Sequence, residues 1–399
     1  MRVAIVGGGV GGLTAAIALA RRGIEVEVYE QAPAINAVGA SLQLGPNALR
    51  LMDELGLLPA LRRIGVRPEA VEFLRWDDGS LLLHMPMGPG MEDHFGAPQL
   101  DFFRPDLHHL LANSLPPGTV RFGARVTGVE ERGEGVELWF EGGERARADI
   151  AIAADGIRSR VRQQLFGVEE PVFSGTVVYR GVAPRERVIE LHPDPVNYYW
   201  LGPYRHGVSY WISSRRLLAV NCAVQRAEWA QESWVQEAPV QEALPYFEGW
   251  HEPLLERIRA CEIFLRGAVF VRQPLAHWAQ GRVALLGDAA HAMEPFQAQG
   301  AAQAVEDAYV LAACLDGADD PLAGLSRYET LRRERAQELQ SSSAAAAGVF
   351  YLPDGEQQRA RDAAYLKLPE KQPYGPRQRI WEYDVRDALR GSSREPSRA

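Results

Sequence analysis

The sequence predicts an α/β protein: a Rossmann-like domain with an inserted mixed or antiparallel β-sheet domain, followed by C-terminal helices. Three observations predict this class. A glycine-rich turn, Gly7–Gly12, follows an apolar run at the start of the chain. A second turn, Gly287-Asp288, follows another apolar run far downstream. Between them, residues 172–270 change to alternating, aromatic-rich segments that are typical of a sheet with one solvated face.

The composition is that of a large globular protein. A length of 399 residues, 46% of them hydrophobic, is enough for one big domain or two intimately joined ones. The net charge of −9 argues against a nucleic-acid groove or an anionic membrane surface. The three cysteines form no CxxC pair, which suits a reducing cytoplasm. We therefore expect a cytoplasmic protein without signal peptide, membrane span or metal ion.

The first thirty residues have the strand–turn–helix–strand order of a dinucleotide-binding unit. Val3–Val6 is a continuous apolar run, residues 13–21 fit a helix, and the strand Glu25–Tyr29 ends on Glu30. Glu30 would accept hydrogen bonds from ribose hydroxyls. The alternative is a tight turn without a ligand. Three glycines would let the backbone approach a pyrophosphate at the helix N-terminus: Gly7, Gly9 and Gly12.

The remaining elements follow from apolar periodicity and turn residues. We expect residues 1–170 to form the nucleotide-binding domain, with residues 70–100 contributing to a substrate sheet formed mainly by residues 171–270. Residues 271–390 would return to the first domain and add the C-terminal helices. Expected strands cover 70–75, 81–87, 120–122, 126–131, 135–140, 149–153, 176–180, 198–201, 208–212, 217–224 and 283–286. Expected helical regions cover 47–55, 104–115, 228–260, 301–315 and 325–347, with a loop at 39–45 and a disordered tail at 392–399.

Two aspartates at strand ends suggest what the dinucleotide is. Gly287-Asp288 precedes a loop that contains Pro295 and a helix that opens at Gln299-Gly300. An acid and a free helix N-terminus can together hold a polyhydroxyl chain and a developing negative charge. Asp155-Gly156 also ends an apolar strand, although either aspartate could be only a helix cap. Combined with the phosphate-binding turn, the pair favours FAD.

The three motifs together resemble the single-component FAD-dependent aromatic hydroxylases, the group of salicylate hydroxylase, 3-hydroxybenzoate 6-hydroxylase and 6-hydroxynicotinate 3-monooxygenase. The resemblance implies bound FAD, NADH or NADPH as co-substrate, and O₂ trapped as a C4a-hydroperoxide that hydroxylates a small phenolic acid. It also implies a homodimer. The similar segments span the chain: GASLQLGPNALR (39–50), FFRPDLHHLL (102–111), AADGIRSRVR (153–162), VVYRG (177–181), GRVALLGDAAHAMEPFQAQGAAQAVEDA (281–308) and RIWEYD (379–384).

The resemblance implies roles for residues around the flavin. The loop from Pro295 to Gly300, with Ala301 in the helix that follows, would lie against the flavin ring. Gln43 would face the flavin where the 6-hydroxynicotinate enzymes carry histidine, which argues against that substrate. Arg50 and Arg104 could approach the diphosphate or the flavin edge, or could be solvated surface arginines.

The sequence HGVSY offers a pair that could act on the substrate. On a strand, His206 and Tyr210 lie on the same face because they are four residues apart. Similar pairs in the family lie near the substrate phenol, so His206 could accept its proton. The alternative places Tyr210 in the core and His206 in a turn. Gln299 could contact the substrate or merely start a helix, and His291 is expected to be structural.

No motif identifies the group that would bind a substrate carboxylate. Arg180, Arg205 and Arg215 are the candidates. Arg180 could instead gate a mobile flavin or contact the pyridine nucleotide.

Three functions remain open. The leading hypothesis is an FAD-dependent monooxygenase that hydroxylates a phenolic acid. The same fold could serve as a flavin monooxygenase or oxidase of natural-product biosynthesis, acting on a larger aromatic compound. A flavin-binding redox sensor without turnover is the alternative from another class. The absence of paired redox cysteines disfavours a disulfide reductase, and the absence of a WxWxIP segment disfavours a halogenase.

Overall fold

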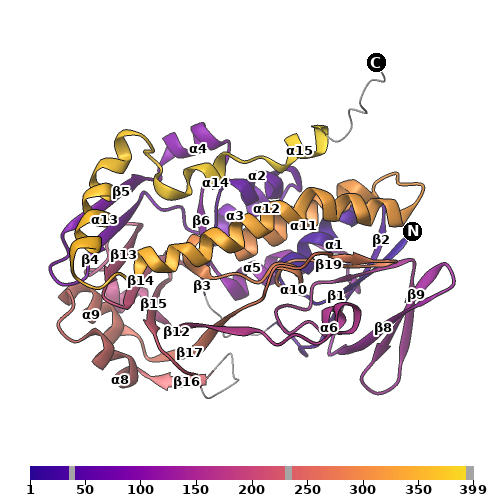
Figure 1. Cartoon of the computed structure of the whole chain (residues 1–399), viewed down its shortest axis with the longest axis horizontal. Helices are drawn as coiled ribbons and strands as arrows, with labels where there is room; N and C mark the ends of the chain where they lie inside the picture. Colours follow the sequence, from indigo (N-terminus) through magenta and orange to yellow (C-terminus); the bar gives the residue numbers. More distant parts are fainter. Residues whose placement is uncertain (36–40, 230–235, 392–399) are drawn as a thin grey trace.

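A computed structural model describes residues 1–35, 41–229 and 236–391 of the chain. The predicted tail at 392–399 and part of the predicted loop at 39–45 lie outside the described residues. Two large sheets lie at opposite ends of the molecule, and the long helix α12 (Pro321–Phe350) runs between them (Figure 1). Within the described ranges, no helix is both long and apolar enough to cross a membrane. The predicted α/β class is confirmed.

The first sheet has the order β18-β19-β11-β1-β2-β7, and all its pairs are parallel except β18 with β19. Its central strands are apolar because α1 (Val10–Ala20) and α11 (Gly300–Leu315) pack with the sheet in one core. The strands at its centre end where the glycine and aspartate turns begin. The strands are β1 (Arg2–Val6), β2 (Glu25–Glu30), β7 (Val120–Phe122), β11 (Ile150–Ala153), β18 (Ala279–Gln280) and β19 (Val283–Leu285).

The second sheet has the order β16-β17-β12-β15-β14-β13-β4-β5 and is mixed, since only β13 and β4 are parallel. Its central strands are buried on both faces over much of their length, and one face turns toward the first sheet's turns. The strands are β4 (Ala70–Arg75), β5 (Leu81–Pro86), β12 (Val172–Pro184), β13 (Val196–Gly202), β14 (Arg205–Ile212), β15 (Leu217–Gln225), β16 (Gln236–Pro239) and β17 (Ile263–Val271). The domain boundaries given above stay a prediction.

The remaining strands form two smaller sheets. β8 (Val126–Arg132), β9 (Gly135–Phe140) and β10 (Arg145–Ala148) form a meander, and β3 (Ser41–Leu44) pairs with β6 (Leu100–Phe103). The sequence did not predict β3, β6 and β10, which have four residues each, nor β17 and β18. The predicted helical region at 228–260 also contains β16, which forms the edge of the second sheet, and its residues 230–235 lie outside the described residues. The segment QEAP of β16 has no alternating apolar pattern, so the sequence does not predict a strand there. Its antiparallel pairing with β17 holds it in the extended conformation.

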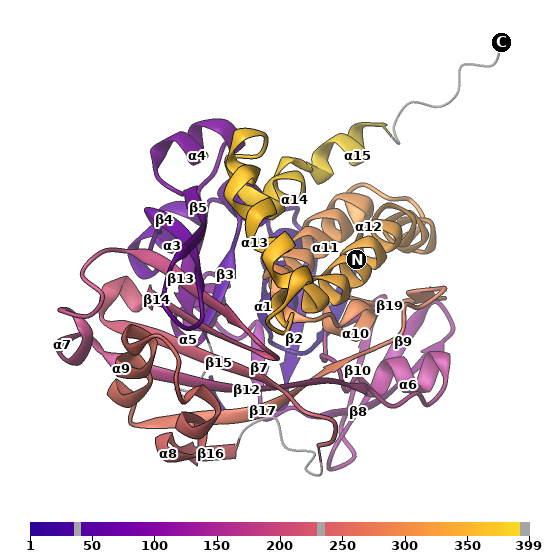
Figure 2. The same ribbon diagram turned by 60° about the vertical axis from the view of Figure 1, so that its left-hand side comes forward.

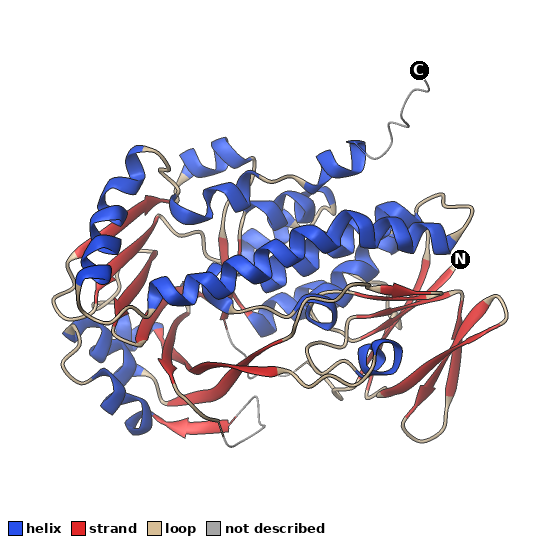
Figure 3. Ribbon diagram, viewed as in Figure 1, coloured by secondary structure: helices blue, strands red, loops and turns tan. Residues whose placement is uncertain are grey.

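Helices cover the sheets, and the helices of the C-terminal segment pack over both halves of the fold (Figures 2 and 3). α13 contacts β5, α14 contacts α2, and α15 contacts α11, so the C-terminal segment returns to both halves of the fold. The other principal helices are α2 (Pro46–Glu54), α3 (Leu58–Ile64), α4 (Pro89–Phe95), α5 (Arg104–Asn113), α6 (Arg160–Phe166), α9 (Glu252–Ala260), α10 (Asp288–His291), α13 (Glu356–Lys367), α14 (Gln378–Glu382) and α15 (Val385–Gly391).

Candidate active site

One cavity of about 900 Å³ joins the turns of the first sheet to the inner face of the second. Every residue of the predicted FAD-binding and catalytic set lines it, whereas the further candidates Arg50, Arg205 and Arg215 do not. From the first half come Gly7, Gly9, Gly12, Glu30, Gln43, Arg104, Asp155, Gly287, Asp288, Pro295, Gln299, Gly300 and Ala301, and from the second sheet His206 and Tyr210. The structure therefore brings these residues together, and their individual roles stay predictions.

The turn between β1 and α1 needs glycine at two positions. A Cβ on Gly7, whose φ is +106°, would lie 2.3 Å from the carbonyl oxygen of Ala154. A Cβ on Gly12 would lie 2.0 Å from the carbonyl oxygen of Gly7. In contrast, a Cβ on Gly9 would meet no protein atom within 4 Å, so this side of the turn is open toward the cavity. Close backbone packing on one side and open space on the other fit a bound pyrophosphate.

Glu30 is tied to the same turn. One carboxylate oxygen accepts a hydrogen bond from the Gly8 amide at 2.7 Å, and the other accepts from the Ala32 amide at 2.8 Å. Each oxygen keeps a further lone pair for a ribose hydroxyl. Glu30 therefore both shapes the phosphate turn and borders the cavity.

Asp155 and Asp288 differ in the hydrogen bonds that their carboxylates make to the protein. Oδ2 of Asp155 accepts from the amide of Arg160 at 3.0 Å, so this carboxylate does act at the start of α6. Its Oδ1 is buried without a partner, and burial raises the pKa of the carboxyl above its ordinary value. Asp288 is exposed to the cavity and makes no helix-capping hydrogen bond. These free oxygens fit hydroxyls of a ribityl chain.

The loop between α10 and α11 forms the wall where a flavin ring would lie. It contains a short 3-10 helix, η3 (Pro295–Gln297), and Ala298 in a left-handed conformation with φ of +53°. α11 then begins at Gly300 without a side chain that caps its first turn. Its free backbone N–H groups can stabilise negative charge in the cavity.

The polar atoms of the Gln299 side chain bond to protein groups rather than pointing freely into the cavity. The side chain is only 1% exposed, and its Oε1 accepts from Asn47 at 3.1 Å and from Gln303 at 3.2 Å. Its Nε2 donates to the carbonyl oxygen of Gln297 at 3.4 Å. The structure thus favours the helix-start interpretation of Gln299 over contact with substrate. His291 is buried and bonded to Asp307 at 2.6 Å, as expected for a structural residue.

His206 and Tyr210 lie on the cavity face of β14. His206 pairs with Leu201 and Ala223 inside the sheet, so the interpretation of this residue as part of a turn was wrong. Its Nδ1 has no hydrogen-bond partner, and burial lowers the pKa of the imidazole to about 3. His206 is therefore neutral at physiological pH and has a nitrogen available as an acceptor. The Tyr210 hydroxyl donates to Ser41 Oγ at 2.7 Å.

Aromatic rings pack around His206, which stays partly exposed to the cavity. Its ring centroid lies 5.7 Å from that of Phe296, 5.3 Å from that of Phe350 and 5.4 Å from that of Tyr351. The β-sheet alternation brings further side chains to the same cavity face: Thr176, Val178, Arg180, Val208 and Asn221. A neutral acceptor inside an apolar wall suits a phenol better than a charged group.

The arginines expected near the ligand behave differently from one another. Arg205 donates to the carbonyl oxygen of Tyr246, and Arg215 lies over the Trp211 ring at 5.6 Å. Neither lines the cavity, so both were wrong as candidates for a carboxylate there. Arg180 does line the cavity, and burial lowers the pKa of its guanidinium to about 10, which leaves it charged at neutral pH.

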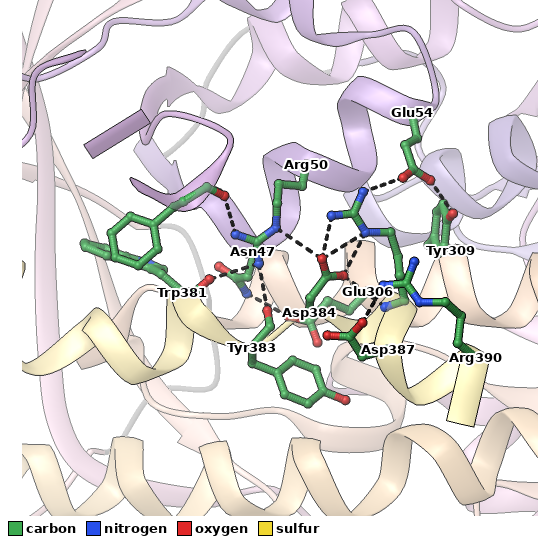
Figure 4. Close-up of polar contacts among 12 residues, drawn as sticks. Asn47, Arg50, Glu54, Glu306, Tyr309, Trp381, Tyr383, Asp384, Asp387 and Arg390 are labelled. Atoms are coloured by element: carbon green, nitrogen blue, oxygen red, sulfur yellow. Dashed lines mark hydrogen bonds and ion pairs between the residues drawn. The ribbon is translucent and has the colours of Figure 1, made fainter. Parts of the chain in front are cut away.

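The sequence left Arg50 open between a contact with the diphosphate or flavin edge and a solvated surface position, and the structure shows neither. Its guanidinium donates to the carbonyl oxygens of Phe95, Trp381 and Tyr383 at 2.7–2.9 Å. It also lies 3.9 Å from the carboxylate of Asp384 (Figure 4). Arg50 therefore fastens the C-terminal segment to α2, and it does not line the cavity. The motifs around Arg50 and Asp384 are linked through this contact.

Two of the cavity residues that the sequence did not predict carry charged groups with consequences for the site. Arg377 comes from the C-terminal segment and belongs to no motif, so no local signal could have identified it. Glu294 immediately precedes Pro295, and an acid inside the proposed flavin loop was a signal that could have been used. Its Oε2 is buried without a partner, and burial raises the pKa of its carboxyl from 4.5 to about 7.

The raised pKa of Glu294 predicts a pH-dependent stability. The folded protein binds this proton more tightly than the unfolded chain does, so stability is lost as pH rises from about 4.5 through 7. Glu294→Gln should therefore unfold at a higher temperature than the wild type at pH 8 and at a similar one at pH 4.5. The exposed Glu248→Gln is the control and should change neither midpoint. A Glu294→Gln effect of equal size at both pH values would contradict the assignment.

Comparison with known proteins agrees with this geometry. Residues 1–343 match the family model described as "FAD binding domain". A 3-amino-4-hydroxybenzoate 2-monooxygenase of Streptomyces platensis is 43% identical, covering 90% of this chain and 91% of the relative. A 6-hydroxynicotinate 3-monooxygenase of Bordetella bronchiseptica is 36% identical, covering 86% and 90%.

Solved structures of similar proteins cover nearly the whole chain. A salicylate hydroxylase substrate complex has a TM-score of 0.80 at 27% identity and covers 100% of this chain and 99% of its own. Klebsiella pneumoniae HpxO in complex with FAD and uric acid has a TM-score of 0.83 at 26% identity, covering 98% and 97%. Motifs, cavity and relatives agree, and the chain belongs to the family of FAD-dependent aromatic monooxygenases.

Proposed function

We propose that this enzyme uses NADH or NADPH and O₂ to hydroxylate a small aromatic acid that carries a ring hydroxyl. The observation that carries the proposal is the single cavity, which continues from the phosphate turn to His206 on the second sheet. Relatives named for 3-amino-4-hydroxybenzoate and 6-hydroxynicotinate support a substrate that combines a carboxylate with a hydroxyl group. The homodimer and the cytoplasmic location implied above stay predictions.

The residues present fit FAD along its whole length. Gly7, Gly9 and Gly12 would hold the pyrophosphate at the N-terminus of α1, and Glu30 would accept from the adenosine ribose. The ribityl hydroxyls would meet Asp155 and Asp288, whose free oxygens were described above. Bound there, FAD would take electrons from NAD(P)H and supply activated oxygen to the substrate.

The protein's own contribution is orientation of the substrate and exclusion of water. Phe296 and Phe350, which line the cavity beside His206, would keep water from the ring of the substrate. The free N–H groups at the start of α11 would stabilise negative charge beside it. His206 would accept a hydrogen bond from the phenol at its unpartnered Nδ1, which orients the ring and polarises its O–H bond.

The function is tested by substrate-stimulated turnover of the purified FAD-loaded protein. We would measure NADH and NADPH oxidation, peroxide and hydroxylated product with 3-amino-4-hydroxybenzoate, 4-hydroxybenzoate, salicylate and 6-hydroxynicotinate. At least one acid should accelerate flavin reduction and yield hydroxylated product with little peroxide. If no phenol accelerates reduction of the flavin, the hydroxylase proposal fails and the redox-sensor hypothesis is favoured. Stimulated oxidation that ends wholly in peroxide would mean that the panel lacks the true substrate.

Asp288→Ala should weaken FAD retention by about 10- to 100-fold, because it removes a charged acceptor from the ribityl chain. The dissociation constant of FAD, measured by fluorescence on the apoprotein, checks this. Asp53→Ala removes an exposed carboxylate on α2 that does not line the cavity, and it should leave the FAD affinity unchanged. Wild-type retention in Asp288→Ala would exclude the proposed role of this carboxylate.

His206→Leu should lower kcat by about 100-fold at pH 7 while FAD stays bound, because the hydrogen-bond acceptor that orients the phenol is lost. Since the pKa of His206 is about 3, the imidazole is neutral throughout the working range and accepts a hydrogen bond without taking the proton. The deficit should therefore shrink at high pH, where the substrate phenol is ionised and no longer donates. The exposed His109→Leu is the control. A deficit that stays constant up to pH 10 would argue against a hydrogen bond from the phenol to His206.

A further inference from the structure

We propose that Arg377, together with the amide of Gln43, forms the subsite that binds the carboxylate of the aromatic substrate. This inference rests on the proposed function and names the residues that select an acid over a neutral aromatic compound. No motif pointed to Arg377, and the arginines Arg205 and Arg215 that the sequence suggested for this task lie outside the cavity. The subsite is assembled from segments far apart in the chain.

Arg377 is a buried guanidinium held only by neutral groups. It ends the short helix η5 (Gly375–Arg377), is 6% exposed, and lines the cavity. It donates to Gln43 Oε1 at 3.3 Å, to the Tyr199 hydroxyl at 3.3 Å and to the carbonyl oxygen of Phe296 at 3.5 Å. Across the described ranges, no carboxylate lies within 4.0 Å of its guanidinium. A buried cation without a counter-ion is unfavourable, so the site favours an anionic ligand.

The buried acid that interacts electrostatically with Arg377 is already bound to other side chains. Asp101 pairs with Gln43 across β6 and β3, and its two carboxylate oxygens accept from Gln99 at 3.1 Å and Asn197 at 2.7 Å. Burial raises the pKa of this carboxyl to about 7, although the charge of Arg377 opposes the rise. Among the described residues, Asp101 forms no ion pair with Arg377 and so does not neutralise it by direct contact.

The hydrogen-bond donors and acceptors around Arg377 also favour an anionic ligand. Gln43 Oε1 accepts from both Tyr199, at 2.9 Å, and Arg377, so the orientation of the amide is fixed by two donors. Its Nε2 is left buried without a partner. A guanidinium carries five N–H donors and an amide two, which exceeds the acceptors present. A carboxylate supplies the missing acceptors and can meet the guanidinium with both oxygens.

The position of the subsite suits a ring whose hydroxyl meets His206. Tyr199 on β13 is directly opposite Val208 on β14, and Val208 lies between His206 and Tyr210 on the same strand face. Tyr199 therefore lies one strand spacing, about 5 Å, from Val208, and His206 lies two residues farther along β14. Arg377 and His206 both line the same cavity. A carboxylate at Arg377 would therefore orient the ring with its hydroxyl toward His206.

Arg180 is the other cavity arginine that could bind the substrate carboxylate, and its position in the sheet distinguishes it from Arg377. It lies on β12, and the cross-strand row runs from Arg180 through Asn221 and Val208 to Tyr199. The two guanidinium groups therefore approach opposite ends of the cavity face. Arg377 is fixed by neighbouring oxygens and has the unpartnered Gln43 amide beside it. We assign the substrate carboxylate to Arg377 for this reason.

The test compares acids with their amides on the FAD-loaded enzyme. Dissociation constants for 4-hydroxybenzoate and 4-hydroxybenzamide, and for 3-amino-4-hydroxybenzoate and its amide, are measured by calorimetry. The wild type should prefer each acid by roughly 100-fold. Arg377→Met should remove this preference and change amide affinity less than about threefold, whereas Arg377→Lys should recover part of it because it keeps the charge without the planar fork. The matched control Arg180→Met should retain the preference.

A second variant guards against loss of folding in Arg377→Met. Gln43→Glu keeps the size of the side chain and adds a carboxylate beside Arg377, so it should also abolish the preference for acids. A preference that survives in both variants, or that disappears in Arg180→Met, would overturn the assignment. Loss of FAD from Arg377→Met in place of lost acid selectivity would overturn it as well. Because binding is measured without turnover, Arg377-dependent acid binding would stand even if no acid stimulated NADH oxidation and the hydroxylase proposal failed.

Discussion

Gly12→Ala should lower the affinity for FAD by about 1000-fold. An added Cβ would lie 2.0 Å from the carbonyl oxygen of Gly7, and both groups belong to backbone that cannot rotate away. The first turn of α1 must therefore move away from β1, and at least two N–H groups lose their alignment with the pyrophosphate. Each charge-assisted hydrogen bond contributes about 2 kcal/mol, so losing two gives the stated factor.

Gly9→Ala is the matched control for this change. Its Cβ would meet no protein atom within 4 Å, and φ of −72° suits alanine. The apoprotein of Gly9→Ala should unfold like the wild type, while Gly12→Ala should be less stable by about 1–3 kcal/mol from overpacking. FAD titration and thermal unfolding of both apoproteins check the pair. Wild-type FAD affinity in Gly12→Ala would exclude the turn as the phosphate site.

The cofactor half of the cavity could be predicted because its signals are local in sequence. Gly7–Gly12, Asp155-Gly156 and Gly287-Asp288 each end a strand of one parallel sheet, and strands of such a sheet deliver their carboxyl ends to one edge. Local order of elements was therefore enough to bring these turns together. The same reasoning placed His206 and Tyr210 on one face of a strand, since strand alternation is also a local rule.

The contact of Gln43 with Arg377 could not be predicted, because tertiary structure creates it. The family resemblance implied that Gln43 faces the flavin, but its position depends on the pairing of β3 with β6, two four-residue strands without a distinctive pattern. Arg377 reaches the cavity only because the C-terminal segment returns over α2, where Arg50 holds it through backbone carbonyls (Figure 4). The sequence left the role of Arg50 open, because a guanidinium in a family motif can bind a phosphate or a backbone carbonyl.

Arg332→Met should reduce the free energy of unfolding by about 3–5 kcal/mol at pH 8, because it leaves two buried carboxylates without their cation. Arg332 reaches from α12 to Asp307 Oδ1 at 2.8 Å, to Glu306 Oε2 at 2.7 Å and to Gln303 Oε1 at 2.6 Å, and all of these side chains are buried. Asp307 also accepts from the Gly287 amide at 3.0 Å. The loss should therefore weaken FAD binding too, through the turn that carries Asp288.

The pH dependence distinguishes lost charge compensation from lost packing. In the wild type, burial alone would raise the pKa of Asp307, but His291 and Arg332 lower it below its ordinary value of 3.8. That carboxylate thus contributes stability above pH 3.8, and the contribution is lost as pH falls further. Without Arg332 the folded-state pKa of Asp307 should rise, because burial then prevails. The variant should accordingly be penalised most at pH 8 and less at pH 5.

Arg333→Met provides the matched control on the same helix. Its guanidinium is 37% exposed and pairs with Glu329 at 2.7 Å, an i,i+4 contact of a kind that contributes about 0.5 kcal/mol. Chemical unfolding of both variants at pH 5 and pH 8 separates the two cases. Arg333→Met should lose less than about 1 kcal/mol at either pH. If Arg332→Met lost no more than that, or lost the same amount at both pH values, the buried ion network would not be what holds α12 and α11 behind the FAD loop.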